Sequence, residues 1–362
     1  MIMELNKIYI ENCLETMKRM PDELVDLTVT SPPYDDLRTY NGIIDKKQPA
    51  QFGWYSFDFE SIAKELYRIT KPGGVVVWVV GDAIDKNGSE TLTSFRQALF
   101  FKECGFNMHD TMIYQKAGMR FPEKKRYNQI FEYMFVFSKG TPKTVNLIMD
   151  RPNRWAGYTN WGSNSTRDSE GNLIKKWVKE DGTVKEVKDC KRYRKYGTRF
   201  NIWLFKTGFG FGTKDKDSHK HPAIFPEALA EDHILSWSNV GDIVYDPFMG
   251  SGTTAKMSVL LNRQYVGSEI DAVYAEDARK RLIKAEDFRG TRLNEFQEAQ
   301  SKRDAEEKEH VEMVEKNVSE TATTDKKKKW QPPQPDKVGK SNFSITDEAE
   351  DIQKSMFSSE TE

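Results

Sequence analysis

The sequence has few cysteines and no long hydrophobic run. Of its 362 residues only three are cysteine, and Cys13, Cys104 and Cys190 lie far apart. Their spacing excludes a disulfide scaffold and a CxxC metal knuckle. No segment approaches the roughly 18 apolar residues that span a membrane. The start, MIMELNKIYIENC, also lacks the features of a signal peptide, so we expect an intracellular, cytoplasmic protein.

The chain also has almost no net charge, but its charges are unevenly distributed. Lys and Arg number 55 against 56 Asp and Glu, whereas residues 111–221 hold 24 basic and 11 acidic residues. Within that range Trp155, Trp161, Trp177 and the run 191–196 mix aromatic and basic side chains. Such a mixture suits phosphates and unstacked bases, although charge runs are also common on ordinary solvated surfaces. The histidines show no metal-ligand spacing, so we expect no metal site.

The pattern of hydrophobic residues predicts an α/β fold. A β-branched strand at 26–30 stops at two prolines, a helix is expected at 57–69, and an unbroken apolar strand follows at 75–80. A strand that is apolar on both faces is typical of the middle of a parallel sheet covered by helices. The α/β pattern is lost between about 141 and 220 and returns over 222–285.

One loop between a strand and a helix has the character of a nucleoside-binding site. It reads Asp246-Pro247-Phe248-Met249-Gly250-Ser251-Gly252-Thr253-Thr254. Its glycines permit a tight turn, and the helix that follows offers free N–H groups. Glu269 ends the next strand, where an acid can bind ribose hydroxyls. A phosphate loop is excluded because the Gly-Lys-Ser/Thr ending is missing, and Asp246 suits a ligand with an ammonium group, such as S-adenosylmethionine. An ordinary glycine-containing corner remains the alternative.

A second loop, Thr30-Ser31-Pro32-Pro33-Tyr34, closes an earlier strand. The two prolines fix the backbone, so the Pro32 carbonyl can be held in one direction. The Ser31 hydroxyl can accept a hydrogen bond, and Tyr34 offers a flat face for stacking. Such a loop suits an exocyclic amine on an aromatic ring. The alternative is a simple Pro-Pro turn at the end of a strand.

Together the two loops resemble those of the S-adenosylmethionine-dependent DNA amino-methyltransferases, the N4-cytosine and N6-adenine family. The order is that of the permuted class, in which the catalytic Ser-Pro-Pro-Tyr loop precedes the recognition region and the cofactor loop comes last. Four further segments are similar to the family: 66–74, 131–139, 221–226 and 267–271. The resemblance covers about 1–285.

The resemblance implies a seven-stranded, mostly parallel, Rossmann-like methyltransferase sheet. It implies that Ser31, Pro32, Pro33 and Tyr34 form the catalytic loop. It assigns S-adenosyl-L-methionine binding to Asp246, Pro247, Phe248, Gly250, Ser251, Gly252, Thr253 and Glu269. The target base would be flipped out of the duplex and methylated by direct transfer, with no covalent nucleophile.

The identity of the base is left open by the residues. Ser31 at the first position of its loop favours N4 of cytosine in this family, as does the segment 221–226, whereas Asp or Asn at the first position favours N6 of adenine. Two other classes of function share the fold: a DNA-binding protein that has lost catalysis, and a methyltransferase acting on RNA or on a protein glutamine. The intact loops argue against the first, and the basic insertion argues for double-stranded DNA.

The same resemblance divides the chain into four parts. Residues 1–140 would be the catalytic half and 216–285 the S-adenosylmethionine-binding half of one methyltransferase domain. Residues 141–215 would be an inserted target-recognition and DNA-binding region. Residues 286–362 are expected to form a charged tail, helical over 291–318 and disordered beyond. We expect no membrane or metal partner; a cognate restriction endonuclease and the oligomeric state are left open.

Overall fold

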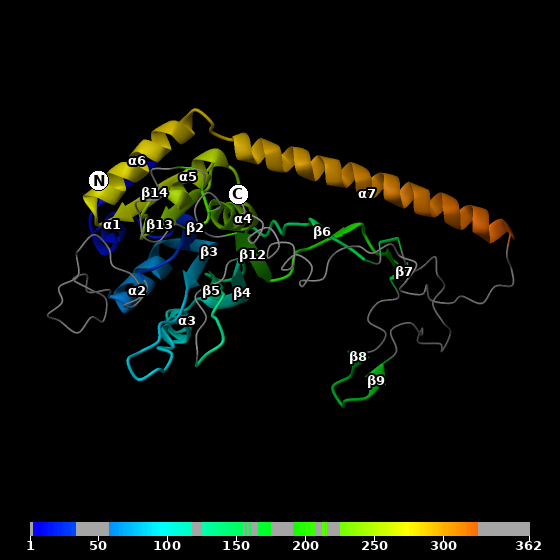
Figure 1. The fold of residues 1–362 in the computed structure, drawn as a ribbon, viewed down its shortest axis with the longest axis horizontal. Coiled ribbons are helices and arrows are strands. Elements are labelled where there is room, and N and C mark those ends of the chain that lie inside the picture. Colours follow the sequence, from blue (N-terminus) through cyan, green and yellow to red (C-terminus); the bar gives the residue numbers. More distant parts are fainter. Residues whose placement is uncertain are drawn as a thin grey trace, which may run out of the picture. The chain divides into compact units, whose positions relative to one another are not determined.

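The computed structural model describes residues 3–33, 58–117, 125–154, 156–157, 159–160, 166–174, 191–206, 212–213, 215 and 225–324. Its main feature is an eight-stranded sheet with the order β1-β14-β13-β2-β3-β5-β4-β12 (Figure 1). These strands are β1 Lys7–Ile10, β2 Val25–Thr30, β3 Thr70–Val80, β4 Asn107–Ala117, β5 Phe131–Ser138, β12 Ile202–Lys206, β13 Ile243–Asp246 and β14 Gln264–Glu269.

Seven of the eight strands run parallel, and β5 is antiparallel to both of its neighbours. Strand β2 is buried along its whole length, and β3 is apolar on both faces and buried from Val75 to Val80, as expected for the middle of a covered parallel sheet. The chain passes from β13 to β14 towards one edge of the sheet and from β2 to β3 towards the other. The boundary between β2 and β13 is therefore a topological switch point, where open α/β sheets bind ligands.

Helices cover the sheet in two groups, which their contacts define (Figure 1). In the first group α1 and α3 both pack against α2, and in the second α4 and α6 both pack against α5. The first group comprises α1 Cys13–Arg19, α2 Phe59–Ile69 and α3 Thr93–Glu103; the second comprises α4 Glu227–Trp237, α5 Thr253–Leu260 and α6 Ala272–Glu286. On β14, Tyr265 packs with α5 and α6 while Val266 belongs to the core on the other side. This alternation is the period-two pattern of a strand buried on both faces.

The predicted α/β class and mostly parallel methyltransferase sheet are confirmed, but the sheet has eight strands where seven were expected. The additional strand is β12, which pairs with β4 over Ile202–Lys206. Its burial alternates, with Trp203 and Phe205 inward and Ile202, Leu204 and Lys206 outward. Because β12 follows a long polar stretch without periodicity, its five residues do not stand out in the sequence.

The described chain forms two compact units, Met1–Leu147 with Phe200–Glu295, and Ile148–Arg199 with Phe296–Glu362. The first contains the sheet. The second contains three short antiparallel pairs and most of the helix α7 Thr291–Thr324. The pairs are β6 Arg151–Pro152 with β11 Tyr196–Gly197, β7 Thr159–Asn160 with β10 Lys191–Arg192, and β8 Thr166–Arg167 with β9 Leu173–Ile174.

Within the second unit, α7 is tied to the basic segment. The Lys195 ammonium and the Tyr196 hydroxyl both donate to Glu306, at 2.9 and 2.7 Å, and the Lys195 backbone N–H donates to Glu307 at 2.6 Å. Disorder was predicted from residue 319, but α7 continues to Thr324, so the helix is longer than expected. Residues 325–362 lie outside the described residues.

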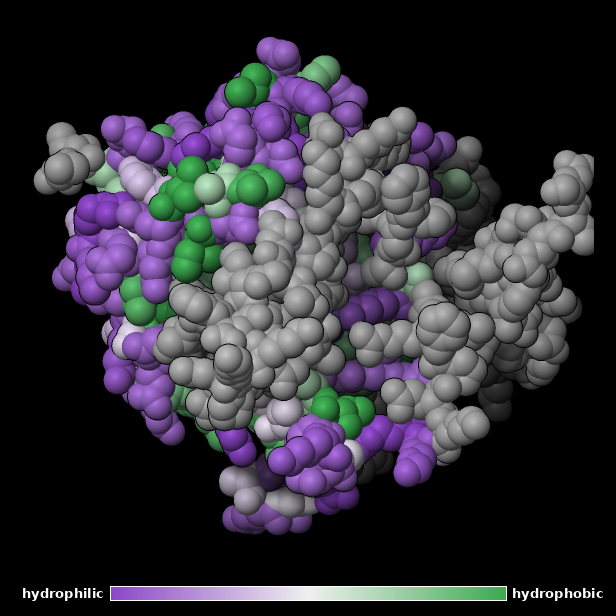
Figure 2. All heavy atoms as spheres, turned by 60° about the vertical axis from the view of Figure 1, so that its left-hand side comes forward, coloured by the Kyte–Doolittle hydropathy of each residue, from purple (hydrophilic) through white to green (hydrophobic). Residues whose placement is uncertain are grey.

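None of the described helices is long and apolar enough to cross a membrane. On the face drawn in Figure 2, the described hydrophobic residues form small groups separated by hydrophilic ones. Phe95 and Leu99 on α3 are among the exposed hydrophobic residues of the chain. Isolated residues of this kind are usual on the surface of a globular protein.

Candidate functional site

The candidate site lies at the carboxyl ends of β2 and β13, on either side of the switch point. The last residue of β2, Thr30, donates from its Oγ1 to Oδ1 of Asp246, the last residue of β13, at 2.6 Å. At the start of the next helix, the Thr254 hydroxyl donates to the Val29 carbonyl at 3.2 Å. These two buried bonds bring the start of the Ser-Pro-Pro loop and the start of the glycine loop together.

The glycine loop is held as a tight turn at the start of α5. Gly250 and Gly252 have φ angles of +51° and +79°, a region that favours glycine. The Phe248 N–H donates to Asp246 Oδ1 at 3.0 Å, and the Gly252 N–H donates to the Met249 carbonyl at 2.8 Å. A Cβ on Gly252 would lie 2.8 Å from the Cβ of Ala278, so the missing side chain also allows α6 to approach the loop.

Glu269 lies beside this loop at the end of β14. Its Oε2 accepts from the Gly250 N–H at 2.7 Å and its Oε1 accepts from the Asp271 N–H at 2.9 Å. Removal from water raises the pKa of Glu269 to about 7, against the two backbone hydrogen bonds that lower it. Burial likewise raises the pKa of Asp246 to about 6, although the Thr30 hydroxyl and the Phe248 N–H favour its ionised form. Two desolvated carboxyl groups therefore face the same edge of the sheet.

The two carboxyl groups and the N–H groups of the glycine loop fit S-adenosylmethionine. A cation such as the ammonium group of its methionine part would compensate a desolvated Asp246, because an opposite charge favours the ionised form of a carboxyl group. Ribose hydroxyls would donate to Glu269 at the end of the adjacent strand. The backbone N–H groups at the start of α5 are accompanied by no lysine of a phosphate loop, so a ligand without phosphate matches the site.

The structure describes the first three residues of the predicted catalytic loop. Pro32 is buried, and Ser31 and Pro33 are partly buried, directly after the last residue of β2. Tyr34 lies outside the described residues, as do residues 221–224 of the segment 221–226 that is similar to the family. Of the predicted cofactor residues, Asp246, Pro247, Gly250, Ser251, Gly252 and Thr253 are buried, and Phe248 and Glu269 are partly exposed. The Phe248 ring packs edge-on against Trp78, with ring centroids 6.1 Å apart.

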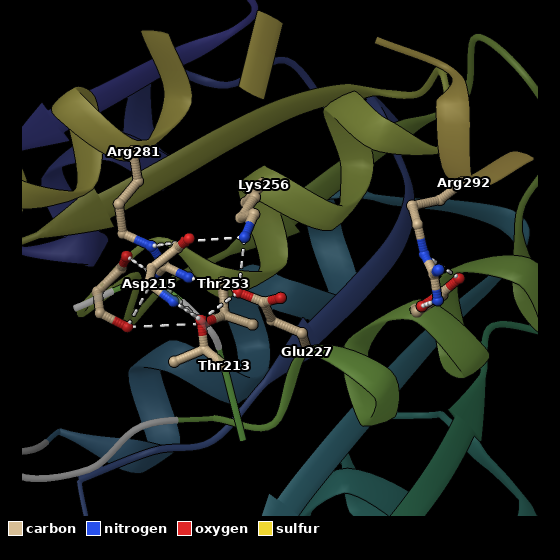
Figure 3. A network of polar contacts seen from close by, with 9 residues as sticks. Thr213, Asp215, Glu227, Thr253, Lys256, Arg281 and Arg292 are labelled. Atoms are coloured by element: carbon tan, nitrogen blue, oxygen red, sulfur yellow. Dashed lines mark hydrogen bonds and ion pairs between the residues drawn. The ribbon is translucent and has the colours of Figure 1, made fainter. Parts of the chain in front are cut away.

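A charged network next to the glycine loop was missed by the sequence analysis (Figure 3). Arg281 of α6 and Lys256 of α5 both bind the carboxylates of Asp215 and Glu227. A signal for it was present, because Arg281 occupies a core-facing position of α6, in line with Tyr274, Ala278 and Leu282. A charged residue at such a position needs a buried partner.

Buried His233 takes no part in this site. It lies in α4 with its Nδ1 accepting from the Trp237 indole N–H at 3.3 Å and its Nε2 3.2 Å from the Met134 sulfur. Burial lowers its pKa to about 3, so the ring is neutral at physiological pH. Among the described residues, no group of three or more His, Cys, Asp and Glu side chains could hold a metal ion.

Known proteins of one family are similar to this chain. The family model described as DNA methylase, of the N6/N4 methyltransferases, matches residues 25–280. The chain is 57% identical over 261 residues to the orphan methyltransferase M.BamHII of Bacillus amyloliquefaciens, covering 72% of this chain and 89% of that protein. It is 25% identical over 288 residues to the DNA adenine methyltransferase YhdJ of Escherichia coli strain K12, covering 78% of this chain and 84% of that protein.

Among solved structures, the PvuII DNA methyltransferase, which is described as cytosine-N4-specific, has a similar fold. The TM-score is 0.52 at 20% sequence identity, and the match covers 78% of this chain and 90% of that one. The family match over most of the chain and the identity with M.BamHII show that this protein belongs to the N6/N4 DNA methylase family, the S-adenosylmethionine-dependent DNA methyltransferases that modify base amines.

Proposed function

We propose that the protein is a site-specific DNA methyltransferase that modifies the N4 amine of cytosine, with N6 of adenine as the alternative. The observation that carries the proposal is the hydrogen bond between Thr30 and Asp246 across the switch point. It fixes the base-binding loop beside the cofactor loop, and transfer between two bound molecules depends on such positioning.

Asp246 and Glu269 would hold the two ends of S-adenosylmethionine, the ammonium group and the ribose hydroxyls. When bound, the cofactor supplies a methyl group on a sulfonium, which is already a strong electrophile. The chain therefore needs no nucleophile of its own. Its residues bind, orient and desolvate the reacting groups, as Asp246 and Pro247 are buried.

Ser31, Pro32, Pro33 and Tyr34 would hold the target base. Flipping a base out of the duplex costs on the order of a few kcal/mol. Stacking on Tyr34 would offset about 1–3 kcal/mol of that cost. The Pro32 carbonyl and the Ser31 hydroxyl would accept hydrogen bonds from the amine, and the rigid Pro32-Pro33 backbone would keep these acceptors in place.

The choice of cytosine rests on Ser31 at the first position of the loop. The similar proteins named above bear both specificities in their names, adenine for YhdJ and cytosine N4 for the PvuII enzyme. The PvuII enzyme is similar in fold alone. This sequence has serine where the adenine enzymes of the family have aspartate or asparagine, and that difference favours cytosine.

Double-stranded DNA would be bound by the basic and aromatic residues of 141–215. Arg151, Arg154 and Arg194 belong to the described part of this segment, and its positive charge suits the phosphate backbone. Phosphate contacts position a protein on the duplex, whereas base contacts select the sequence.

The decisive experiment is incubation of the full chain with S-adenosylmethionine and unmethylated DNA of varied sequence, followed by digestion to nucleosides and mass spectrometry. We expect N4-methylcytosine. N6-methyladenine would retain the mechanism and refute the interpretation of Ser31. No methylated base would overturn the proposal; methyl transfer to RNA or protein, or sequence-specific DNA binding without transfer, would then identify the alternative class.

The role of Ser31 is tested by Ser31→Ala. Because the hydroxyl would contact the amine and not the cofactor, we expect kcat to fall at least about tenfold, the effect of losing about one strong hydrogen bond in the transition state. Calorimetry should give an unchanged Kd for S-adenosylmethionine. An unchanged kcat would show that Ser31 is not part of the catalytic loop.

A further inference from the structure

Four charged side chains form a compact network beside the glycine loop (Figure 3). Lys256 Nζ lies 2.8 Å from Asp215 Oδ2 and 2.8 Å from Glu227 Oε1. Arg281 approaches the same two oxygens with Nε and Nη2, each at 2.9 Å. Each of the two cations thus contacts both carboxylates, and the four charges of the network sum to zero.

The network joins two separate points of the chain. The Glu227 N–H donates to the Gly212 carbonyl at 3.0 Å, and the Thr213 hydroxyl donates to Glu227 Oε1 at 2.6 Å. The Asp215 N–H in turn donates to the Thr213 hydroxyl at 3.1 Å. Gly212, Thr213 and Asp215 are therefore anchored to the first turn of α4 by backbone and side-chain bonds together.

The network also reaches the glycine loop itself. Arg281 Nη1 donates to the carbonyl oxygen of Ser251 and lies 3.2 Å from the Ser251 hydroxyl. It also lies 3.5 Å from the Thr253 hydroxyl. Ser251 stands between Gly250 and Gly252, the two loop residues with positive φ, so Arg281 binds the loop at its sharpest turn.

Such a network contributes more to position than to stability. Arg281 is 3% exposed, and burying charges costs free energy that their mutual attraction offsets only when the geometry is good. Burial alone would raise the pKa of Asp215, but the hydrogen bonds from Lys256 and Arg281 outweigh it and hold that pKa below its usual value. Asp215 therefore stays ionised, and Arg281 is held in one place by two carboxylates.

We propose that Asp215, Glu227, Lys256 and Arg281 are positioning residues that hold the glycine loop in the shape that binds S-adenosylmethionine. The inference rests on the proposed assignment of this loop to the cofactor. It adds residues outside the loop to those that would bind the cofactor. Arg281 binds the turn at Ser251, and Asp215 and Glu227 hold Arg281 in place.

Two glutamates of α4, one helical turn apart, provide a matched test. Glu227 belongs to the network, whereas Glu231 pairs with Arg292 through two bonds of 3.0 and 2.7 Å. The described hydrogen bonds of Arg292 go to Glu231 and Glu295, and Arg292 lies apart from the network in Figure 3. Glu227 is partly buried and Glu231 is buried. Both Glu227→Gln and Glu231→Gln remove one carboxylate charge from an arginine partner, so both should lower the thermal midpoint.

The measurement is calorimetric binding of S-adenosylmethionine to the two full-length variants and the wild type. We expect Kd to rise about tenfold for Glu227→Gln, as for the loss of one charge-assisted hydrogen bond, and to stay within about twofold for Glu231→Gln. Equal Kd values at a similar loss of thermal midpoint would overturn the inference. Asp215→Asn, which leaves Glu227 to pair with both cations, carries the same expectation and serves if Glu227→Gln does not fold.

The proposed function is tested separately by Glu269→Gln. If Glu269→Gln binds S-adenosylmethionine as tightly as the wild type does, or if the wild type does not bind it, the assignment of the loop to the cofactor is wrong. Weak binding by Glu269→Gln together with wild-type binding by Glu227→Gln and Asp215→Asn refutes the positioning network alone.

Discussion

At the scale of single residues, Asp246 and Glu269 each cost free energy of folding, because a carboxylate is removed from water. Both are carboxylic acids whose ionised form is disfavoured by removal from water, with pKa values of about 6 and about 7. Perturbed groups of this kind concentrate at functional sites. A ligand that brings a positive charge and hydroxyl donors would lower both pKa values and recover the cost, which is why these two acids identify the site better than its glycines do.

The raised pKa values predict that cofactor binding depends on pH. Below about pH 7 Glu269 takes up a proton in the free protein, and binding must release it, so affinity should fall with falling pH. We expect Kd for S-adenosylmethionine to rise about tenfold between about pH 7 and about pH 6, and more steeply below, where Asp246 also takes up a proton. Titration calorimetry between about pH 5.5 and about pH 7.5, in buffers of different ionisation enthalpy, measures Kd and the released protons.

The control for this prediction is Glu269→Gln, which removes the titrating group of higher pKa. Its Kd should already be raised at the upper end of the range and should vary less as the pH falls. If the Kd of the wild type does not change with pH, the assignment of Glu269 as the acceptor of hydrogen bonds from the ribose hydroxyls is wrong.

At the scale of elements, the approach of α5 to α6 depends on the absence of a side chain at Gly252. Its φ of +79°, and the 2.8 Å that would separate an added Cβ from the Cβ of Ala278, make Gly252→Ala doubly unfavourable. Gly241 has a similar φ of +82°, and a Cβ there would meet nothing within 4 Å. The two positions separate backbone strain from crowding.

We therefore expect Gly241→Ala to lower the free energy of unfolding by about 1–2 kcal/mol, the cost of a left-handed conformation. Gly252→Ala should lower it by about 1–3 kcal/mol more, because the helices must also move apart. Urea unfolding measures both values. Equal losses in the two variants would show that α6 adapts to the added methyl group without cost.

Elements also show how far the sequence could be interpreted. The strand 75–80 and the helix 57–69 were predicted because each carries its own pattern. The strand lies within β3, and the helix corresponds to α2 within two residues. Strand β12 was missed because its burial comes from pairing with β4, a contact distant in sequence. The Thr30–Asp246 hydrogen bond was missed for the same reason. The sequence placed both residues at the ends of strands, but the two strands are neighbours only in the folded sheet.

At the scale of the whole molecule, a nearly neutral chain contains opposite charges that contact each other within the second unit. The basic segment includes Lys195 and Tyr196, and α7 supplies Glu306 and Glu307 as their partners. Hydrogen bonding to Glu306 raises the pKa of both Lys195 and Tyr196. If this segment binds DNA as proposed, the helix competes with phosphate for the same ammonium group.

Neutralising that partner should strengthen DNA binding. In Glu306→Gln the Lys195 ammonium loses its carboxylate, and one further phosphate contact steepens the slope of log K against log salt by about 0.9. Glu312→Gln, at an exposed position of the same helix, removes the same charge away from Lys195 and should leave the slope within error. Fluorescence anisotropy with a labelled duplex between about 50 and about 200 mM salt compares the two. Equal changes in both variants would mean that α7 acts only through its net charge, and weaker binding by Glu306→Gln would mean that the glutamate holds Lys195 in place for DNA rather than away from it.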